Sequence, residues 1–377
     1  MRRHLLHPAA RASSVLEVAD ALVALHSTDP ASVFLSLRAR AAELDPGAIE
    51  RELYEERTVV RMLGMRRTLF VVPIHRRAIV QAACTDEIAA RERTRLEGWL
   101  ADTPGIEDPS AWLVAAEEAA LEAVRDAGEA STAELVRTVP LLATKLGVGT
   151  GRWKVEVSAG SRVLPLLAAQ GRLVRSRPRG SWVSGQYRWA LPGTWLGEEL
   201  ELPTAEEARS SLIRCWLQAF GPGTELDLRW WTGLGARAVR TALSEIGAVE
   251  VALEGTTGLA LRDDLDPVEK PEPSATLLPT LDPTTMGWKE RNWYLGAHHE
   301  LLFDRNGNAG PTVWWDGRVA GGWTQRPDGE IAYRLLEDVG AEAGAAVEAE
   351  AGRLAEWLGD VRLRPGFLPP FHRELGS

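Results

Sequence analysis

The chain has 377 residues, of which 45% are hydrophobic and 25% are charged, and its formal net charge is −10 at pH 7. This composition excludes a disordered chain and allows about two to four globular domains. No stretch approaches the roughly 20 apolar residues of a membrane span and the N-terminus has no apolar signal core, so we expect a cytoplasmic protein that does not enter membranes.

The first predicted unit covers residues 1–105. Apolar residues at helical spacing predict short helices near 15–25, 31–42 and 46–56. The next stretch, TVVRMLGMRRTLFVVP, predicts a hairpin, because both arms are β-branched or apolar and Gly64 to Arg67 fall between them. Helices followed by a hairpin are the sequence outline of a winged helix.

The second predicted unit, residues 106–200, repeats this outline. Helices are expected near 110–127 and 131–139, and a further helix ends at Gly171, a natural C-cap position. Two strands then flank a turn of Pro, Gly and Ser.

Positive charge is concentrated in this second unit. Residues 151–190 hold eight Lys or Arg against one acid, a net charge of +7 in an otherwise acidic chain. A basic stretch of this kind suits a polyanionic partner such as DNA, although the whole chain is acidic. The alternative is a solvated basic face.

The third predicted unit covers residues 201–268. A helix near 205–219 is followed by the helical patterns LDLRWWTGL and ARAVRTALSEIGA. The stretch VEVALEGTTGLALRDDL then predicts a short hairpin whose turn is Gly-Thr-Thr-Gly.

The last predicted unit, residues 269–377, follows the Pro-rich and acidic linker DPVEKPEPSA. Short strands, Asp-Gly turns and many Trp residues predict a small β-barrel or a strongly curved sheet packed on the third unit. An Ala-rich helix is expected near 340–358. The fold class is therefore α+β, with three tandem winged-helix units followed by a small C-terminal β-barrel-like domain.

Several kinds of site are excluded by motif. Only Cys84 and Cys215 are present, which gives no disulfide framework and no paired metal ligands, so we expect no metal. The segment GVGTGR lacks the Lys-Ser/Thr of a phosphate loop and is interpreted as a loop. Neither a Gly-x-Ser-x-Gly elbow nor a HExxH zinc helix occurs.

The stretch LHSTDP joins the first two predicted helices and has two interpretations. Ser27, Thr28 and Asp29 before Pro30 are residue types that cap a helix, and His26 can end the preceding helix. Alternatively, His26, Thr28 and Asp29 act on a substrate, since a neutral imidazole orients water and a carboxylate stabilises positive charge. Both interpretations stay open at this point.

Five motifs together resemble the winged-helix DNA glycosylases of the AlkZ/YcaQ type: RRHLL, LHSTDPASVFLSLRAR, RMLGMRRTLFVVP, DLRWWTGL and LLPTLDPTTMGWKERNW. The resemblance covers essentially the whole chain. It implies monofunctional hydrolysis of the N-glycosidic bond of N7-alkylated purines in double-stranded DNA, with neither metal nor cofactor. For some members it also implies unhooking of interstrand crosslinks made by DNA-alkylating natural products, as self-resistance.

The resemblance places catalysis at the HST stretch. The family's signature is a Gln, a small or apolar residue, and then a Gln or Asp, just after the first helix; His26 stands at the first of these positions and Thr28 at the last. Asp29 adds a carboxylate. Because an N7-alkylpurine is already cationic and leaves as a neutral base, the enzyme must mainly place water near C1′ and stabilise charge on the sugar.

Basic residues near these motifs are the candidate DNA contacts. Arg175, Arg177 and Arg179 alternate along the second hairpin, and Trp182 at its tip is a candidate wedge between bases. The alternative is a solvated wing with Trp182 packed inward. The remaining candidates lie beside the HST stretch, at the first hairpin, in the basic stretch and in MGWKERNW: Arg38, Arg40, Arg66, Arg67, Lys154, Lys289 and Arg291.

Two classes of function follow. The first is a monomeric DNA glycosylase for alkylated or crosslinked duplex DNA, in repair or genotoxin resistance. The second is a non-enzymatic DNA binder, either a lesion binder or a transcriptional regulator, that lost catalysis with the Gln motif; loss of DNA binding altogether is a third interpretation. An enzyme needs His26 and Thr28 near a channel floor with room for water, whereas a binder tolerates both residues in caps.

Overall fold

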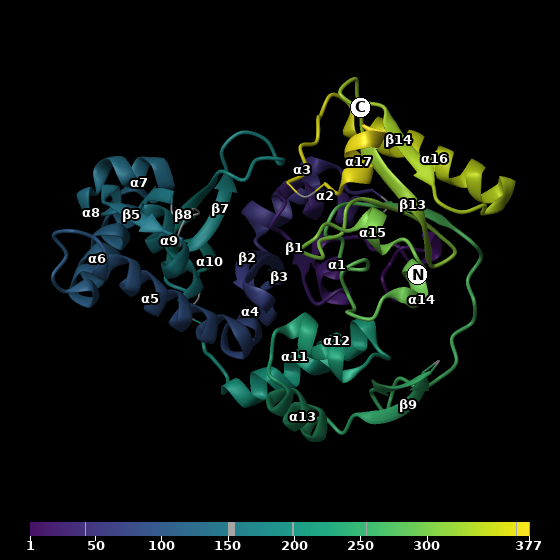
Figure 1. Cartoon of the computed structure of the whole chain (residues 1–377), viewed down its shortest axis with the longest axis horizontal. Helices are drawn as coiled ribbons and strands as arrows, with labels where there is room; N and C mark the ends of the chain where they lie inside the picture. The colour runs from purple at the N-terminus through teal and green to yellow at the C-terminus, as the bar shows by residue number, and fades with distance from the viewer. Residues whose placement is uncertain (42, 150–154, 198–199, 254, 367, 377) are drawn as a thin grey trace.

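The computed structural model describes residues 1–41, 43–149, 155–197, 200–253, 255–366 and 368–376. Helices and strands are mixed along the whole chain, as predicted, and the strands of the described residues form antiparallel sheets. Figure 1 shows the first part of the chain near the centre, with residues 106–197 to its left, α11 to α13 below it and the C-terminal sheet at the upper right.

The first unit is built on a sheet of order β1-β3-β2. Its helices are α1 (Val15–Ala21), α2 (Pro30–Arg38) and α3 (Pro46–Arg51), and its strands are β1 (Leu25–His26), β2 (Val59–Gly64) and β3 (Thr68–Pro73). The predicted hairpin is confirmed, with Gly64 paired to Thr68 next to the turn. The helix predicted near 15–25 is too long, because Leu25 and His26 pair with β3 instead.

Of the other two helices of this unit, the one predicted near 31–42 is shorter than predicted, and the one predicted near 46–56 has its predicted extent but changes type. Helix α2 begins at Pro30 and ends at Arg38, four residues before the predicted end. Helix α3 ends at Arg51 and continues as a π-helical turn, Glu52–Glu56. The unit is joined to the next one by α4 (Arg77–Val80), a π-helical turn (Gln81–Thr85) and α5 (Asp86–Ala101).

The second unit has a three-stranded sheet of order β4-β8-β7 and a separate hairpin, β5-β6. Its helices are α6 (Pro109–Ala127), α7 (Thr132–Thr138), α8 (Pro140–Ala143), α9 (Gly160–Ala169) and α10 (Pro192–Leu196). Its strands are β4 (Glu129–Ser131), β5 (Lys145–Val148), β6 (Val155–Ser158), β7 (Val174–Pro178) and β8 (Tyr187–Ala190). The loop interpretation of GVGTGR is wrong at its start, because Gly147 and Val148 belong to β5.

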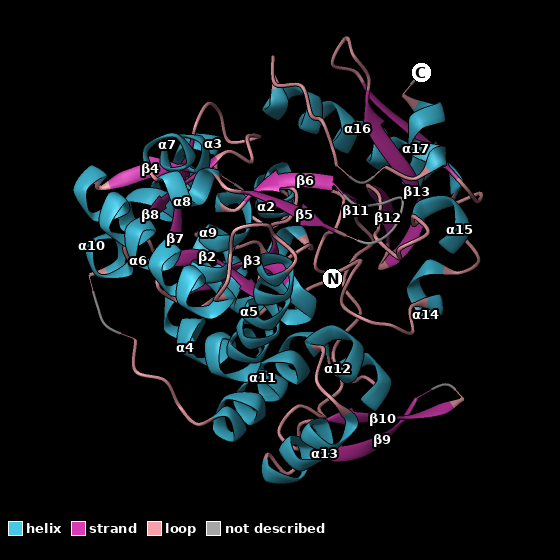
Figure 2. Ribbon diagram, turned by 60° about the vertical axis from the view of Figure 1, so that its left-hand side comes forward, coloured by secondary structure: helices cyan, strands magenta, loops and turns pink. Residues whose placement is uncertain are grey.

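The third unit contains α11 (Ala205–Phe220), α12 (Glu225–Thr232), α13 (Ala236–Glu245) and the hairpin β9 (Val249–Leu253) and β10 (Thr256–Ala260). Figure 2 shows this hairpin at the edge of the molecule, beside α12 and α13. The predicted Gly-Thr-Thr-Gly turn is wrong by about two residues. Thr256 and Thr257 already lie in β10, paired with Leu253 and Ala252.

The C-terminal segment forms a four-stranded sheet of order β11-β12-β13-β14. Its strands are β11 (Ala275–Leu278), β12 (Thr312–Trp315), β13 (Arg318–Gln325) and β14 (Ile331–Leu335), and its helices are α14 (Asn292–Leu295), α15 (His299–Leu302), α16 (Gly340–Leu358) and α17 (Pro370–Leu375). In the described residues β11 and β14 are free edges, so the sheet is open and is not a closed barrel. Helix α16 confirms the predicted Ala-rich helix.

Buried apolar residues join these units unequally. Phe70 of β3 shares one cluster with Phe220 and Trp231 of the third unit and with Tyr294 and Trp314. Leu278 and Val319 of the C-terminal sheet belong to the same cluster, so the predicted packing of that sheet on the third unit is confirmed. In a second cluster, the other face of the sheet packs with helix α2 and with α16. Most buried apolar residues of the second unit form a third cluster with α5, while Trp182 and Trp195 belong to the second cluster. The first and third units and the C-terminal segment are therefore held together by apolar packing.

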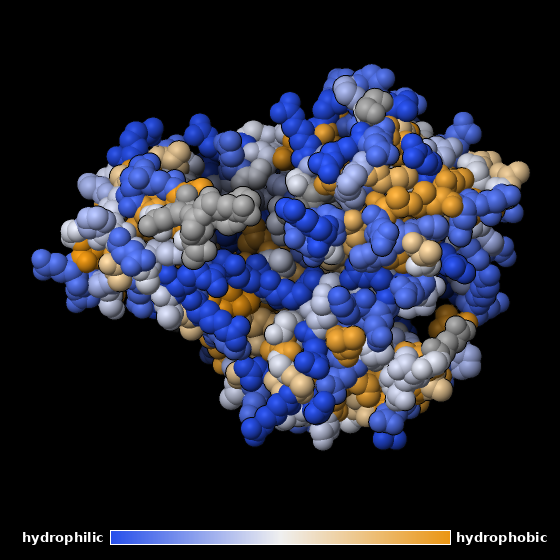
Figure 3. All heavy atoms as spheres, in the orientation of Figure 1, coloured by the Kyte–Doolittle hydropathy of each residue, from blue (hydrophilic) through white to orange (hydrophobic). Residues whose placement is uncertain are grey.

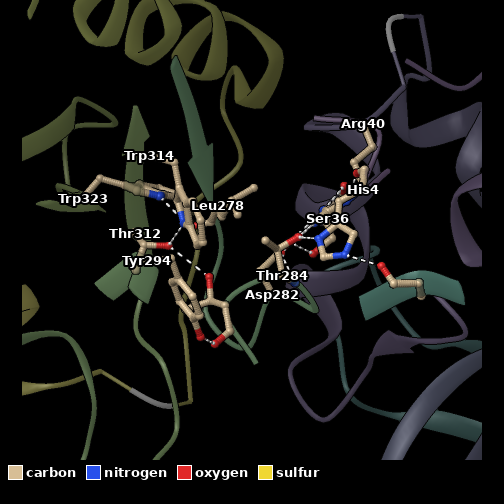
Figure 4. A network of polar contacts seen from close by, with 12 residues as sticks. His4, Ser36, Arg40, Leu278, Asp282, Thr284, Tyr294, Thr312, Trp314 and Trp323 are labelled. Carbon is tan, nitrogen blue, oxygen red and sulfur yellow. Dashed lines mark hydrogen bonds and ion pairs between the residues drawn. The ribbon is translucent and has the colours of Figure 1, made fainter. Parts of the chain in front are cut away.

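A buried polar network adds to this packing (Figure 4). Arg40, just after α2, binds Asp282 through both terminal nitrogens, at 2.8 and 2.7 Å. Ser36 donates to the same carboxylate at 2.7 Å, and His4 lies 2.9 Å from Thr284. The network fixes the segment after β11 against the first unit. Of the described helices, none is both long and apolar enough to cross a membrane.

Candidate functional site

His26 lies on the edge strand β1 and is only 6% exposed. Both ring nitrogens are buried without a hydrogen-bond partner among the described residues. Burial, assisted by the charge of Arg66, lowers the pKa of His26 to about 3. The imidazole is therefore neutral at physiological pH, and one of its nitrogens is free to accept a hydrogen bond.

This imidazole lines a pocket of about 240 Å³. Figure 3 shows a hollow bordered largely by hydrophilic residues between the second unit and the rest of the molecule, but no described residue of the second unit lines the His26 pocket. The pocket walls come from the first hairpin, α12, the segment after β11 and the loop after α15. The lining residues are His26, Arg66, Thr68, Trp230, Met286, Lys289, Arg291, His299, Asn306, Gly307 and Asn308.

Two arginines of the pocket contact one tryptophan. The guanidinium of Arg66 lies 4.0 Å from the ring centroid of Trp230, and that of Arg291 lies 5.0 Å from it. Arg291 also lies over Phe303, at 4.6 Å. Burial, with a smaller contribution from Arg291, lowers the pKa of Arg66 to about 10, so both side chains stay charged. The aromatic rings hold two partly desolvated cations in place.

The motif DLRWWTGL explains how Arg66 reaches this position. Helix α12 begins with a reciprocal cap between Thr224 and Asp227, and its C-cap is Gly233, which has φ +78°. A Cβ at Gly233 would lie 3.3 Å from the backbone nitrogen of Arg66. Arg66 itself has a left-handed backbone, with φ 53°. The glycine therefore ends the helix and lets the turn of the first hairpin approach it closely.

The other two predicted catalytic residues do not reach the pocket. Asp29 caps α2, accepting from the backbone nitrogens of Ala31 at 3.0 Å and Ser32 at 3.4 Å, and it also accepts from Gly366 at 3.1 Å. It lines a different cavity of about 20 Å³. Thr28 is exposed and lines neither cavity. The cap interpretation therefore holds for Asp29, and only His26 of the three faces the pocket.

Arg38 and Arg40 are not placed to contact DNA. Arg40 is fully buried in its ion pair with Asp282, and Arg38 is 10% exposed at its side chain and pairs with Glu350 of α16. Both side chains are used inside the protein, which does not suit their predicted role as DNA contacts. Helix α2 is covered by the C-terminal segment, which the sequence alone does not reveal.

The second hairpin also differs from its prediction. Trp182 is 7% exposed and stacks on Phe34, with ring centroids 4.8 Å apart, so the exposed wedge is wrong and the inward packing is right. Arg177 pairs with Glu55 at 2.8 Å. Arg179 is exposed and lies 3.7 Å from Glu134.

Arg175 and the rest of the basic stretch are likewise partnered. The guanidinium of Arg175 lies 4.8 Å from the ring centroid of Trp189, and burial lowers its pKa to about 10. Arg172 and Arg188 face Glu117 and Glu129. Acids from neighbouring elements thus offset much of the charge that the sequence concentrates here. Lys154 lies outside the described residues.

The remaining predicted contacts are placed around the pocket. Lys289 and Arg291 line it together with Arg66, whereas Arg67 is exposed and pairs with Glu92 at 2.7 Å. Sequence reasoning missed Trp230, His299, Asn306 and Asn308, which also line the pocket. The two adjacent Trp residues of DLRWWTGL could have pointed to Trp230. For the other three, no spacing in the sequence links the loop after α15 to the HST stretch. The described residues hold no cluster of His, Cys, Asp and Glu that suits a metal ion.

Comparisons with known proteins agree on one family. Residues 19–357 match the family model described as DNA glycosylase AlkZ-like. The chain is 27% identical to the interstrand DNA cross-link repair glycosylase of Streptomyces sahachiroi over 216 residues, which are 55% of this chain and 57% of that protein. The match in sequence therefore spans just over half the length of that relative.

The fold is shared over nearly the whole chain. The solved structure of the Streptomyces sahachiroi DNA glycosylase AlkZ superimposes with a TM-score of 0.73 at 24% sequence identity, covering 96% of this chain and 95% of that chain. At this sequence identity the superposition shows only that the two chains share a fold. Because the family model spans most of the sequence, the chain belongs to the DNA glycosylase AlkZ-like family.

Proposed function

We propose that the protein is a monofunctional DNA glycosylase that hydrolyses the N-glycosidic bond of N7-alkylated purines or crosslink adducts in double-stranded DNA. The observation that carries the proposal is the buried, neutral and unpartnered imidazole of His26, which faces a cationic pocket. His26 stands where the family signature has its first glutamine. In this proposal the protein acts as a monomer in the cytoplasm, on the chromosome, without metal or cofactor.

In this mechanism His26 orients the attacking water. A neutral imidazole accepts a hydrogen bond from water and takes up the proton as the C1′–N9 bond breaks. The alkylated base needs no protonation, because it is cationic before cleavage and neutral afterwards. Asp29 accepts hydrogen bonds from two backbone N–H groups of the cap and from that of Gly366, so we assign it a structural role in placing β1 and α2.

We further infer that the three units made of helices and a hairpin are winged helices that line a channel for duplex DNA. The proposal is supported by the sheet and hairpin in the first two units and by α11 to α13 with β9-β10 in the third. Arg66, Lys289 and Arg291 would meet DNA at the pocket, and Arg67, Arg175, Arg177 and Arg179 farther out.

Release of 7-methylguanine from a methylated duplex, followed by chromatography of the free base, tests the proposal. We expect release from the methylated duplex and none from the unmethylated duplex of the same sequence. Duplex binding with no release of 7-methylguanine or of bulkier adducts would instead support the non-enzymatic binder.

A further inference from the structure

The His26 pocket holds more positive charge than its described walls neutralise. Arg66, Lys289 and Arg291 line it, and no aspartate or glutamate is among the described lining residues. Since charged groups removed from water need a partner, such a pocket calls for an anion.

Unpaired hydrogen-bond donors of Arg66 and Arg291 also indicate that the pocket lacks an anionic partner. Arg291 is 5% exposed, and its Nε and Nη1 are buried without a partner among the described residues. The Nε of Arg66 is buried without a partner in the same way. Buried polar groups in folded proteins are nearly always hydrogen-bonded, so unpaired ones in a pocket indicate a missing ligand.

Two carboxylates that act electrostatically on pocket residues, Asp227 on Arg291 and Asp282 on His26, already have other partners. Asp227 accepts from the backbone nitrogens of Lys289 at 2.8 Å and Glu290 at 2.9 Å. Its other oxygen accepts from the backbone and hydroxyl of Thr224. Asp282 is bound to Arg40 on both oxygens. Neither acid supplies the hydrogen bonds that Arg66 and Arg291 lack.

We propose that this pocket binds a phosphate group through Arg66, Lys289 and Arg291. Guanidinium groups match the oxygens of a phosphate, and both arginines are fixed by the Trp230 ring before any ligand arrives. Of the parts of a nucleic acid, only the phosphate carries negative charge at neutral pH. In a DNA complex the group is a backbone phosphodiester, and this assignment rests on the proposed function.

A phosphate in this place explains how the pocket tolerates a cationic base. Without an anion, Arg66 and Arg291 would repel an N7-alkylpurine beside His26. A phosphodiester seated between the guanidiniums cancels much of that repulsion and holds the adjoining sugar near the imidazole. The phosphate therefore positions the nucleotide for attack by the water on His26.

Calorimetric titration of the full-length protein with inorganic phosphate and with dimethyl phosphate, at constant ionic strength, tests the proposal. We expect both to bind, and Arg66→Gln and Arg291→Gln to weaken binding about tenfold or more. Arg240→Gln is the matched control, because Arg240 is exposed on α13 and pairs with Glu225 at 2.9 Å. Arg66→Lys keeps the charge and should bind with intermediate affinity, which guards against misfolding of the Gln variants.

Three results would overturn the proposal. The first is that the native protein does not bind phosphate, and the second is that the Arg66 and Arg291 variants bind it as tightly as the native protein. The third is an equal loss of affinity in Arg240→Gln, which would indicate that phosphate responds to the overall charge of the protein and not to this pocket. A duplex with an abasic-site analogue should displace inorganic phosphate; failure to compete removes the assignment to the DNA backbone. Base release is measured separately. Phosphate binding without base release would count only against the proposed glycosylase function, and base release without phosphate binding would count only against the proposed phosphate site.

Discussion

His26 and Phe70 lie directly opposite each other in the antiparallel pairing of β1 with β3, and their ring centroids are 4.6 Å apart. The aromatic ring covers one side of the imidazole and keeps it out of water. The register of two short strands thereby sets the protonation state of the candidate catalytic group, since burial is the main cause of its lowered pKa.

Acid should destabilise the protein well before its carboxylates titrate. The pKa values of His4 and His26 are lowered to about 3 and that of His372 to about 4, in each case mainly by burial. The unfolded chain binds protons near pH 6.5 where the folded one does not, so stability falls as pH drops below 6.5. Each such histidine contributes a loss of about 2 kcal/mol by pH 5. Urea unfolding at pH 7 and pH 5 measures this loss, and His26→Gln should show a smaller one; equal stability at both pH values contradicts the prediction.

The buried ion pair of Arg40 and Asp282 should be costly to break. Asp282→Asn leaves the guanidinium of Arg40 without its counterion, and we expect a loss of about 3–5 kcal/mol in the free energy of unfolding. Glu330→Gln removes the partner of Arg326 in an exposed pair and should cost less than about 1 kcal/mol. Similar losses in the two variants, measured by denaturant unfolding, would show that the network does not hold the C-terminal segment.

Gly233→Ala should disturb both stability and the pocket. The position combines φ +78° with a Cβ site 3.3 Å from the backbone of Arg66. We expect a loss of about 1–2 kcal/mol from the backbone strain together with weaker phosphate binding. Gly247→Ala is the control, because it has φ +65° but no atom within 4 Å of its Cβ site. It should lose stability and keep phosphate affinity; weaker binding in both variants rejects a local effect on Arg66.

Trp182→Ala tests the corrected position of this tryptophan. Because its indole packs on Phe34 and Trp357, we expect a loss of about 3–5 kcal/mol in unfolding free energy. Arg179→Ala, on the same hairpin but exposed, should change stability by less than about 0.5 kcal/mol. If Trp182→Ala is as stable as the native protein and loses only affinity for duplex DNA, the interpretation of Trp182 as a wedge between bases would be supported instead.

Local patterns in the sequence predicted most of the elements. The hairpin around Gly64 to Arg67, helix α16 and the cap at Asp29 all depend on residues close together in the chain, and each was foreseen. Chain order alone could not show which faces are covered. Arg40 and Trp182 look accessible in sequence, yet Asp282 and Phe34, far away along the chain, bury them.

The candidate site was predicted in part for the same reason. His26, Arg66, Lys289 and Arg291 were expected to act, and the structure brings them to one pocket. Thr28 and Asp29 are neighbours of His26 in sequence, but a strand followed by a helix start turns their side chains elsewhere. The charge of the basic stretch was misleading, because ion pairs with Glu55, Glu117 and other distant acids form only in the folded chain.

The most direct test of the central claim is single-turnover release of 7-methylguanine by the native protein, His26→Ala and Thr28→Ala. We predict a fall of at least tenfold in the rate for His26→Ala, about 1.4 kcal/mol of transition-state stabilisation, and little change for Thr28→Ala. His75→Ala is the matched control, because His75 is exposed and pairs with Asp20. Release that is equally fast in native protein and His26→Ala would contradict the assignment of this pocket as the active site.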